Sequence, residues 1–331
     1  MTPPARLQRL VCAPAKRIAD RLLSGIRMRQ HLREARRILD TPPIMARQDG
    51  VVLLSMIGSR VLLPYLVAIK SFHHHLGMGR IVLIDDGTLT AADRAILDHH
   101  CGSPEIVPIA TLDTGACPRG GTWERLLMLL DRRARDYVIQ LDSDTVTIGD
   151  VPEIRAAIAA NRNFILLGDP ASEAVGIQSL PDFVAWKYPG GPIPAPAHMQ
   201  ALIESRYGDY PDAARHRYVR ASSGFAGFAR GGPGDRAEAT TFSRHAEHLV
   251  GQPVWWRWGS EQVTSNFLLA NEPGSRLLPY ARYYNYWLQP ASDDARFIHF
   301  VGTHRYSDQS YIRATRRAID TLTAAARRSP A

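Results

Sequence analysis

Short apolar runs recur through the first half of the chain, and longer amphipathic segments separate them. Runs this apolar are typical of strands that are covered on both faces of a parallel sheet. The predicted strands are 50–56, 80–84, 105–109 and 137–141, and the predicted helices are 60–76, 91–100 and 122–135. Thr90 is expected to cap the helix that follows it. The alternation predicts an α/β sheet with helices on both faces, because parallel neighbouring strands need long crossover connections.

The second half of the chain is less regular. Residues 181–213 are rich in Pro, Gly and Tyr and predict a long loop region, and ordered loops of this length are often binding elements. Shorter strands are expected around 164–168, 224–229 and 296–301. A final helix is expected from residue 310 onward, fraying into Arg-Arg-Ser-Pro-Ala.

Before the first strand, apolar residues recur at helical spacing between arginines. Residues 14–40 therefore predict a basic amphipathic helix, which Thr41-Pro42-Pro43 would end. One interpretation is an anchor that lies in the surface of an anionic membrane. The other is a solvated helix whose apolar stripe packs on the domain, and the pattern leaves both open. The predicted organisation is an extension at 1–48, one α/β domain at 49–308, and a C-terminal helix and tail at 309–331.

The charge of the chain is concentrated in that extension. Of 40 Lys and Arg and 32 Asp and Glu, residues 1–48 hold 11 and 3, a net +8, so the remainder holds 29 of each sign. A neutral domain does not favour binding to nucleic acid. The three cysteines form no CxxC pair and indicate neither a disulfide framework nor a zinc site. With no apolar run of about 18 residues, the expected location is the cytoplasm, or the inner face of the membrane if residues 14–40 bind it.

Two carboxylates follow the predicted strand 137–141 at its C-terminal end. Asp142 and Asp144 are separated by Ser143, and alternate residues of an extended chain point to the same side. Open α/β sheets bind their ligands at this edge. Two unpaired carboxylates would repel each other there, so the pair indicates a divalent ion, and Mg²⁺ or Mn²⁺ suits carboxylate and phosphate oxygens. The alternative is a solvated turn in which one of the acids caps the next helix.

The segment around these acids, 137–146, resembles the DxD strand of GT-A-fold glycosyltransferases, closest to the group of glycogenin and the bacterial lipopolysaccharide galactosyltransferases. Three later segments are similar to further motifs of that family, in the same order. Residues 222–228 resemble its Asn-Ser-Gly strand, 260–268 its Asp-Gln-x-x-Leu-Asn helix, and 299–306 its HFxGxxK motif. The set spans about residues 50–306. It implies a GT-A fold, with a mostly parallel, Rossmann-like central sheet flanked by helices.

The resemblance also implies roles for individual residues. Asp142, Asp144 and His299 would bind Mn²⁺ or Mg²⁺ that bridges the nucleotide diphosphate. Gly302 would let the backbone approach a phosphate closely, and Arg305 stands where the family usually has Lys, which preserves the charge. Without the resemblance, His299 would be taken as a core histidine and Arg305 as a surface charge.

Further residues are candidates for the donor site and the chemistry. By the resemblance, Asp85 and Asp86 would contact the base or ribose of the nucleotide sugar, although Asp-Asp-Gly also favours a plain turn. Ser143 is a further residue expected to bind the nucleotide sugar. Glu261 and Gln262 are the catalytic candidates, because carboxylate and amide oxygens stabilise an oxocarbenium-like transition state. An acid at a helix N-terminus is the structural alternative for Glu261.

The acceptor candidates are Ser223, Gly224 and Trp258. Trp258 belongs to an aromatic cluster at 255–258, and a second cluster lies at 280–287. Aromatic faces stack on sugars, but core packing explains such clusters equally well.

Together these features predict a glycosyltransferase that moves a sugar from a nucleotide-diphosphate donor to a saccharide or glycolipid acceptor. The favoured donor is a UDP-sugar, and the expected setting is cell-envelope polysaccharide synthesis. Retention and inversion stay open. One alternative is a nucleotidyltransferase that makes nucleotide sugars. It needs a Gly-rich loop after its first strand, where this chain has Ser55-Met56-Ile57-Gly58-Ser59-Arg60. The other alternative is a non-catalytic GT-A domain that binds a nucleotide sugar or scaffolds a partner.

Overall fold

A seven-stranded sheet forms the centre of the computed structural model, which describes residues 5–328, with side chains from residue 20 onward. The strands lie in the order β10-β6-β9-β4-β1-β2-β3, so β4 is the middle strand. Their bounds are β1 Val51–Ile57, β2 Arg80–Asp85, β3 Glu105–Pro108, β4 Tyr137–Leu141, β6 Phe164–Leu167, β9 Ala221–Phe228 and β10 Arg276–Leu277. All four strands predicted in the first half of the chain are present.

The sheet is mostly but not wholly parallel. β1, β2, β3 and β4 are parallel to one another, and β6 is parallel to β10. β9 runs antiparallel to both of its neighbours, β4 and β6. A strand that is buried on both faces, as β9 is, has the same kind of sequence pattern in either direction, which is why the pattern could not give its direction. The predicted fold class, a mostly parallel central sheet flanked by helices, is confirmed.

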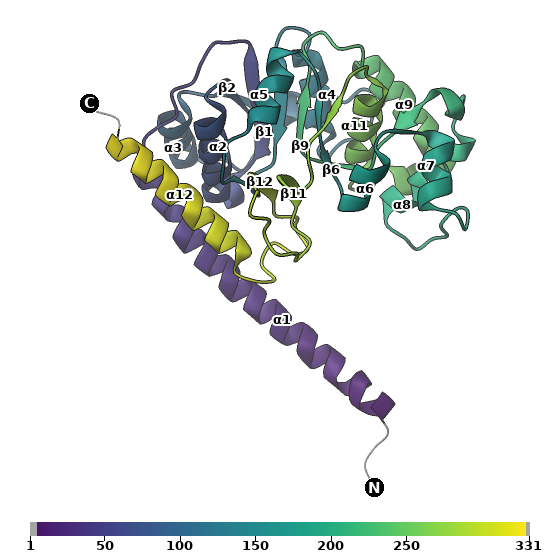
Figure 1. Cartoon of the computed structure of the whole chain (residues 1–331), viewed down its shortest axis with the longest axis horizontal. Helices are drawn as coiled ribbons and strands as arrows, with labels where there is room; N and C mark the ends of the chain where they lie inside the picture. Colours follow the sequence, from purple (N-terminus) through teal and green to yellow (C-terminus); the bar gives the residue numbers. More distant parts are fainter. Residues whose placement is uncertain (1–4, 329–331) are drawn as a thin grey trace.

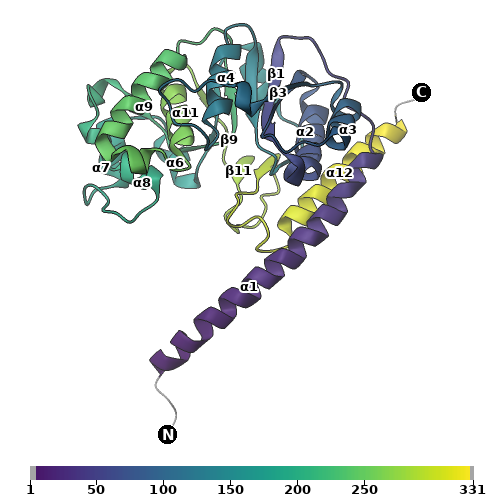
Figure 2. The ribbon, with the colours of Figure 1, turned by 180° about the vertical axis from the view of Figure 1, so that it is seen from behind.

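Helices flank this sheet (Figures 1 and 2). The α-helices are α1 Ala5–Ala35, α2 Leu62–Leu76, α3 Ala91–Cys101, α4 Trp123–Arg132, α5 Pro152–Ala159, α6 Pro170–Val175, α7 Leu180–Lys187, α8 Met199–Glu204, α9 Arg236–Val250, α10 Gln252–Trp255, α11 Ser260–Asn271 and α12 Ser310–Arg328. The predicted cap of α3 is confirmed. The Thr90 hydroxyl accepts from the Asp93 amide, and the Asp93 carboxylate accepts from the Thr90 amide.

The prediction of one long loop at 181–213 is wrong. This segment contains most of α7, all of α8 and a 3₁₀ turn at Tyr207–Asp209, and a second 3₁₀ turn begins at its end. A two-stranded sheet, β7 Gln178–Ser179 with β8 Arg217–Tyr218, lies at its borders. The Ser179 hydroxyl caps α7 by accepting from the Asp182 amide, and Phe183 and Tyr207 are buried. Helices of six to eight residues show too little periodicity to stand out in a segment rich in Pro and Gly.

A second, three-stranded sheet brings distant parts of the chain together. Its order is β11-β12-β5, with bounds β5 Thr145–Thr147, β11 Tyr283–Asn285 and β12 Phe297–His299. β12 runs antiparallel to β5 and parallel to β11. The rings of Phe225 on β9 and Phe297 on β12 stack with their centroids 4.0 Å apart. Packing of this aromatic pair therefore fixes the small sheet against the large one.

α1 and α12 lie side by side and run in the same direction (Figure 1). The buried His31 ring stacks on Tyr311 at 3.8 Å, and its Nε2 is 3.0 Å from the Thr315 hydroxyl. α12 reaches Arg328, so the two arginines predicted to fray are helical. Residues 1–4 of the predicted extension and 329–331 of the predicted tail lie outside the described residues.

The N-terminal helix packs on the domain through only part of its length. α1 begins at Ala5, earlier than predicted, and a 3₁₀ turn at 36–40 follows it. Ala35 and Ile38 are buried, whereas the side chains of Leu22 and Ile26 are 64% and 49% exposed. Both views show the N-terminal half of the helix projecting beyond the rest of the fold (Figures 1 and 2).

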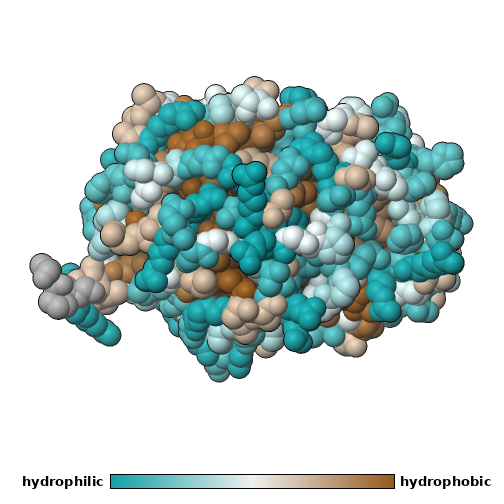
Figure 3. Space-filling view, turned by 90° about the horizontal axis from the view of Figure 1, so that it is seen from above, coloured by the Kyte–Doolittle hydropathy of each residue, from teal (hydrophilic) through white to brown (hydrophobic). Residues whose placement is uncertain are grey.

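Among the described helices, none combines the length and apolar character that a membrane span requires. Hydrophilic side chains cover most of the face seen from above, with hydrophobic areas between them (Figure 3). Cys101 and Cys117 are buried free thiols, and Cys12 belongs to the residues whose side chains are not described.

Candidate metal centre and active site

Asp142 and Asp144 follow β4 directly, at the C-terminal edge of the middle strand. The chain does not stay extended here, because Ser143 and Asp144 form a turn in which the Thr145 hydroxyl donates to the Asp142 carbonyl at 2.9 Å. Asp142, Asp144 and His299 each offer one ligand atom, and these three atoms lie within 4.8 Å of one another. The structure thus brings the three predicted ligands together, by a turn rather than by strand alternation.

Pairing between β12 and β5 delivers His299 to this turn. His299 lies opposite Thr145, the residue after Asp144, and the Phe300 amide donates to the Asp144 carbonyl at 2.8 Å. The imidazole Nε2 is 3.3 Å from Asp144 Oδ1 and 4.0 Å from Asp142 Oδ2. One nitrogen of the ring therefore faces both carboxylates.

Gly224 leaves the space that the His299 ring occupies. It lies on β9, and its carbonyl accepts from the Asp142 amide at 2.8 Å. A Cβ added at Gly224 would lie 2.7 Å from His299 Nε2 and 2.8 Å from Nδ1, closer than a side chain tolerates. The sequence predicts Gly224 in the acceptor site, whereas the structure places it against the predicted metal ligand His299.

Two arginines balance the negative charges of the turn, Arg305 at Asp144 and Arg125 at Asp142. Burial alone would raise the pKa of Asp144, but His299 and Arg305 hold it below its ordinary value. Burial alone would lower the pKa of His299, but Asp144 and Asp142 raise it above its ordinary value. The Arg305 guanidinium forms an ion pair with Asp144. Positive groups thus already compensate these acids, in the way that a bound cation would.

Arg125, on α4, is a site residue that the sequence analysis missed. Its side chain is buried, it forms an ion pair with Asp142, and its guanidinium lies 3.8 Å from Glu261 Oε1. The one sequence signal is its place among buried leucines in a strongly amphipathic helix, where a charged residue needs a partner. Arg125 joins the turn at Asp142 to the first turn of α11.

Glu261 is buried at the start of α11, and its burial raises the pKa of its carboxyl. Oε2 accepts hydrogen bonds from the hydroxyls of Thr122 at 2.8 Å and Ser223 at 3.0 Å. Oε1 has no hydrogen-bond partner among the described residues. The Ser223 amide also donates to Gln262 Oε1 at 3.3 Å. Ser223, Glu261 and Gln262 therefore form one polar cluster next to the predicted metal site.

The remaining donor candidates lie in turns. Gly302 is exposed beside Arg305, where an added Cβ would meet only the Arg305 side chain at 3.9 Å, and Ser143 is half-buried in the turn between the two acids. The Asp85 carboxylate accepts from the Gly87 and Leu89 amides and pairs with Arg94.

Asp86 accepts from the amide and the hydroxyl of Thr88. Both acids thus stabilise the turn after β2, as expected for a plain Asp-Asp-Gly turn. Their contact with a nucleotide stays a prediction.

The aromatic clusters divide between core and surface. Trp255, Tyr283 and Tyr286 are buried and pack in the core, but Trp258 is 68% exposed, just before α11. The Trp258 backbone borders Gly121, which precedes the Thr122 whose hydroxyl donates to Glu261, so the Trp258 backbone lies near the cluster.

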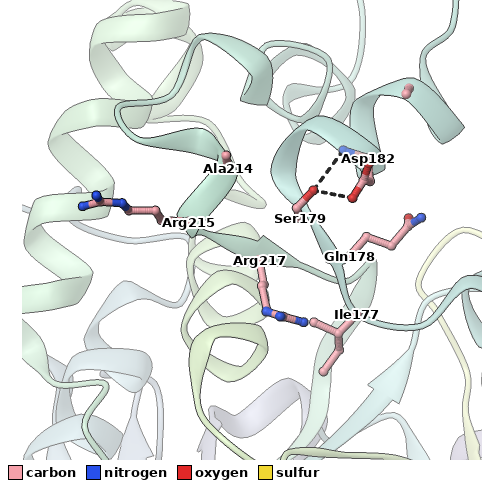
Figure 4. A pocket seen from close by; sticks show the side chains of 8 residues that line it. Ile177, Gln178, Ser179, Asp182, Ala214, Arg215 and Arg217 are labelled. Carbon is pink, nitrogen blue, oxygen red and sulfur yellow. Dashed lines mark hydrogen bonds between the residues drawn. The ribbon is translucent and has the colours of Figure 1, made fainter.

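A cavity of about 540 Å³ lies beside α7 and β8, lined by Ser179, Asp182 and Arg217 among others (Figure 4). Its Ser179–Asp182 contacts are the cap of α7. None of the predicted site residues lines it, so it is separate from the acidic turn.

The residues at the turn fit a hard divalent cation. Two carboxylates and an imidazole are suitable ligands for Mn²⁺, and their atoms are already close together. Gly224 leaves room for the His299 ring at this position, with Nε2 turned toward both carboxylates.

No known protein-family model and no curated protein sequence matches the chain. Among solved structures, the galactosyltransferase LgtC in complex with donor and acceptor sugar analogues is 12% identical over 81% of this chain and 95% of its own, with a TM-score of 0.48. The bifunctional glycosyltransferase WbbM is 15% identical over 85% of this chain, with a TM-score of 0.44, and this chain covers 53% of it, about half its length. Mouse xyloside xylosyltransferase 1 is 10% identical over 77% of this chain and 98% of its own, with a TM-score of 0.43. All three proteins are glycosyltransferases by name.

Proposed function

We propose that this chain is a metal-dependent glycosyltransferase that moves a sugar from a nucleotide-diphosphate donor, first of all a UDP-sugar, to a saccharide or glycolipid acceptor of the cell envelope. The meeting of Asp142, Asp144 and His299 at the end of the middle strand carries the proposal. Ligand sites of open α/β sheets lie at this edge, and two acids with one imidazole suit a metal ion that holds a diphosphate.

In this proposal, Asp142, Asp144 and His299 hold Mn²⁺ or Mg²⁺, which acts as a Lewis acid on the departing nucleoside diphosphate. Arg305 is the protein's own phosphate ligand. Its guanidinium already lies at Asp144, and a planar guanidinium can donate two parallel hydrogen bonds to a phosphate. Gly302 and Ser143 lie beside these groups and would border the phosphates.

Glu261 and Gln262 are the proposed catalytic residues. The buried Glu261 carboxylate keeps Oε1 free of hydrogen bonds within the described chain, and such an oxygen can stabilise positive charge at the reacting sugar carbon. Arg125 and the hydroxyls of Thr122 and Ser223 keep this carboxylate in place. Ser223 and the exposed ring of Trp258 border the same cluster and would contact the sugars.

The test is a panel of nucleotide sugars, in which release of nucleoside diphosphate is measured with and without Mn²⁺. Asp144→Asn should abolish the metal-dependent release, and Asp98→Asn, at an exposed position on α3, should not change it. Release of pyrophosphate from a nucleoside triphosphate and a sugar phosphate would instead identify a nucleotidyltransferase. Donor binding without turnover of any acceptor would identify a non-catalytic binding domain.

We further propose that the N-terminal helix makes peripheral contact with an anionic membrane. Leu22, Ile26, Arg29 and Arg33 follow one another at helical spacing along one side of α1, and all four are exposed. Apolar side chains next to arginines suit a helix that lies in the interface between headgroups and acyl chains. This contact would place the enzyme at the inner face of the membrane, beside a glycolipid acceptor.

A further inference from the structure

The imidazole of His299 is held on the side away from the carboxylates. Its Nδ1 lies 2.7 Å from Asn285 Oδ1, and both residues are buried. Asn285 lies on β11, directly opposite His299 in the parallel pairing of β11 with β12. The contact between the two side chains therefore follows from the register of the small sheet.

The orientation of the Asn285 amide is fixed by the end of another strand. Asn285 Nδ2 lies 2.7 Å from the carbonyl of Leu167 and 3.2 Å from that of Gly168, at the end of β6. Carbonyl oxygens accept hydrogen bonds and cannot donate them. If the amide were reversed, its oxygen would face two carbonyl oxygens, so Nδ2 must point to them and Oδ1 must point to His299.

This orientation decides which nitrogen of His299 carries a proton. Asn285 Oδ1 is an acceptor, so Nδ1 can contact it at 2.7 Å only as an N–H donor. The Ser222 hydroxyl, 3.2 Å from Nδ1, does not decide the matter, because a hydroxyl can donate or accept. With the proton held on Nδ1, the lone pair of the neutral ring lies on Nε2, the atom that faces Asp144 and Asp142.

We propose that Asn285 is a positioning residue that fixes the proton on His299 Nδ1 and thereby presents Nε2 to the metal. The inference rests on the proposed function, which supplies the metal. Histidine ligands in metal sites commonly donate their second N–H to a fixed acceptor, and loss of that acceptor typically weakens metal binding about 10- to 100-fold. Asn285 also joins the site to the large sheet through the end of β6.

The hydrogen bond itself can be tested in the protein without metal, by NMR of ¹⁵N-histidine-labelled protein, with the His299 signals assigned from a His299→Gln variant. The proton on Nδ1 should be observed in the wild type and should exchange slowly with water. In Asn285→Ala it should exchange fast or be lost. A His299 ring whose proton is on Nε2 alone would overturn the proposal without reference to any metal.

The second test measures the affinity for Mn²⁺ alone, from the free-ion signal in electron paramagnetic resonance. Asn285→Ala should weaken binding about 10- to 100-fold. Asn285→Asp retains an acceptor for Nδ1–H but loses both donors to Leu167 and Gly168, so it should bind Mn²⁺ more tightly than Asn285→Ala. If both variants weaken binding equally, the acceptor is irrelevant and the proposal fails.

A double-mutant cycle separates a role through His299 from a general loss of structure. In a His299→Ala background, Asn285→Ala should have no further effect on Mn²⁺ affinity, and full additivity would contradict the proposal. Asn271→Ala is the matched control, because the Asn271 amide also donates to two backbone carbonyls, but far along α11 from the ring. It should leave Mn²⁺ affinity unchanged.

The outcomes distinguish this inference from the proposed function. A wild-type protein that binds no Mn²⁺ would remove the metal site and both conclusions with it. Mn²⁺ binding that depends on Asp144 and His299 but not on Asn285 would overturn the positioning role alone. Mn²⁺ binding that depends on all three, with no sugar transfer from any donor, would overturn the proposed activity and retain the role of Asn285.

Discussion

Gly224→Ala is a test of the proposed metal centre that changes no charged group and no proposed ligand. Gly224 does not adopt a positive φ, so alanine is acceptable to the backbone there, and the effect arises from the added methyl group alone. That methyl would lie 2.7 Å from His299 Nε2 and 2.8 Å from Nδ1. The perturbation is therefore directed at one imidazole ring.

The expected magnitude follows from contact distances. Optimal separations of non-bonded heavy atoms begin near 3.5 Å, so the ring must retreat by roughly 1 Å. Metal–ligand distances tolerate only about 0.2 Å, and Asn285 holds the opposite side of the ring, so His299 should be lost as a ligand. We expect Mn²⁺ affinity to fall about 10- to 100-fold, as for loss of a supporting contact to a ligand, and stability to fall by about 1–3 kcal/mol through overpacking.

The assay combines Mn²⁺ titration by electron paramagnetic resonance with urea unfolding. Gly227→Ala is the matched control on the same strand, since its methyl would strike the Phe164 ring and lie 2.7 Å from the Tyr137 hydroxyl. It should lower stability but leave Mn²⁺ affinity unchanged. Gly208→Ala, which meets open space, should change neither. Wild-type Mn²⁺ affinity in Gly224→Ala would refute the assignment of His299 as a ligand.

Three further predictions concern Arg305 at the proposed metal site and the N-terminal helix. Arg305→Ala should raise the affinity for Mn²⁺ alone, because it frees Asp144 from its ion pair. The same variant should weaken nucleoside diphosphate binding by about tenfold, because a charged hydrogen bond is lost. Calorimetry measures both affinities. Burial, assisted by Arg305, lowers the pKa of His31 from 6.5 to about 3, so the undocked helix takes up a proton that the docked helix excludes. Docking of α1 on α12 should therefore weaken as the pH falls from about 6.5 toward 3, seen as faster hydrogen exchange near His31. His31→Phe should reduce this dependence and leave only the part that arises from protonation of Glu34, which pairs with Arg316 on α12. The double variant Leu22→Glu, Ile26→Glu should reduce sedimentation with anionic lipid vesicles by tenfold or more, because each apolar side chain contributes about 1.5–3 kcal/mol when it is buried. Met45→Glu, at an exposed position beyond the helix, should not reduce it.

Much of the fold could be predicted from local pattern. The strands and helices from 50 to 141 follow from runs and periodicities that operate over a few residues, and the cap at Thr90 follows from a spacing of three. Composition was misleading at 181–213, where short helices capped by side chains such as Ser179 are hidden among Pro and Gly. The sequence pattern could not predict the direction of β9 either, because the neighbouring strands decide whether a strand pairs parallel or antiparallel.

Local sequence is enough to place Asp142 and Asp144 at the end of a largely apolar strand that belongs in the core. Their neighbours follow only from the folded arrangement of the chain. His299 reaches the turn because β12 pairs with β5, Asn285 reaches His299 because β11 pairs with β12, and Arg125 joins Asp142 to Glu261 from a helix. The physical reason is that periodicity records which face of an element is buried, whereas the register between strands far apart in the chain is fixed only when their buried side chains pack together.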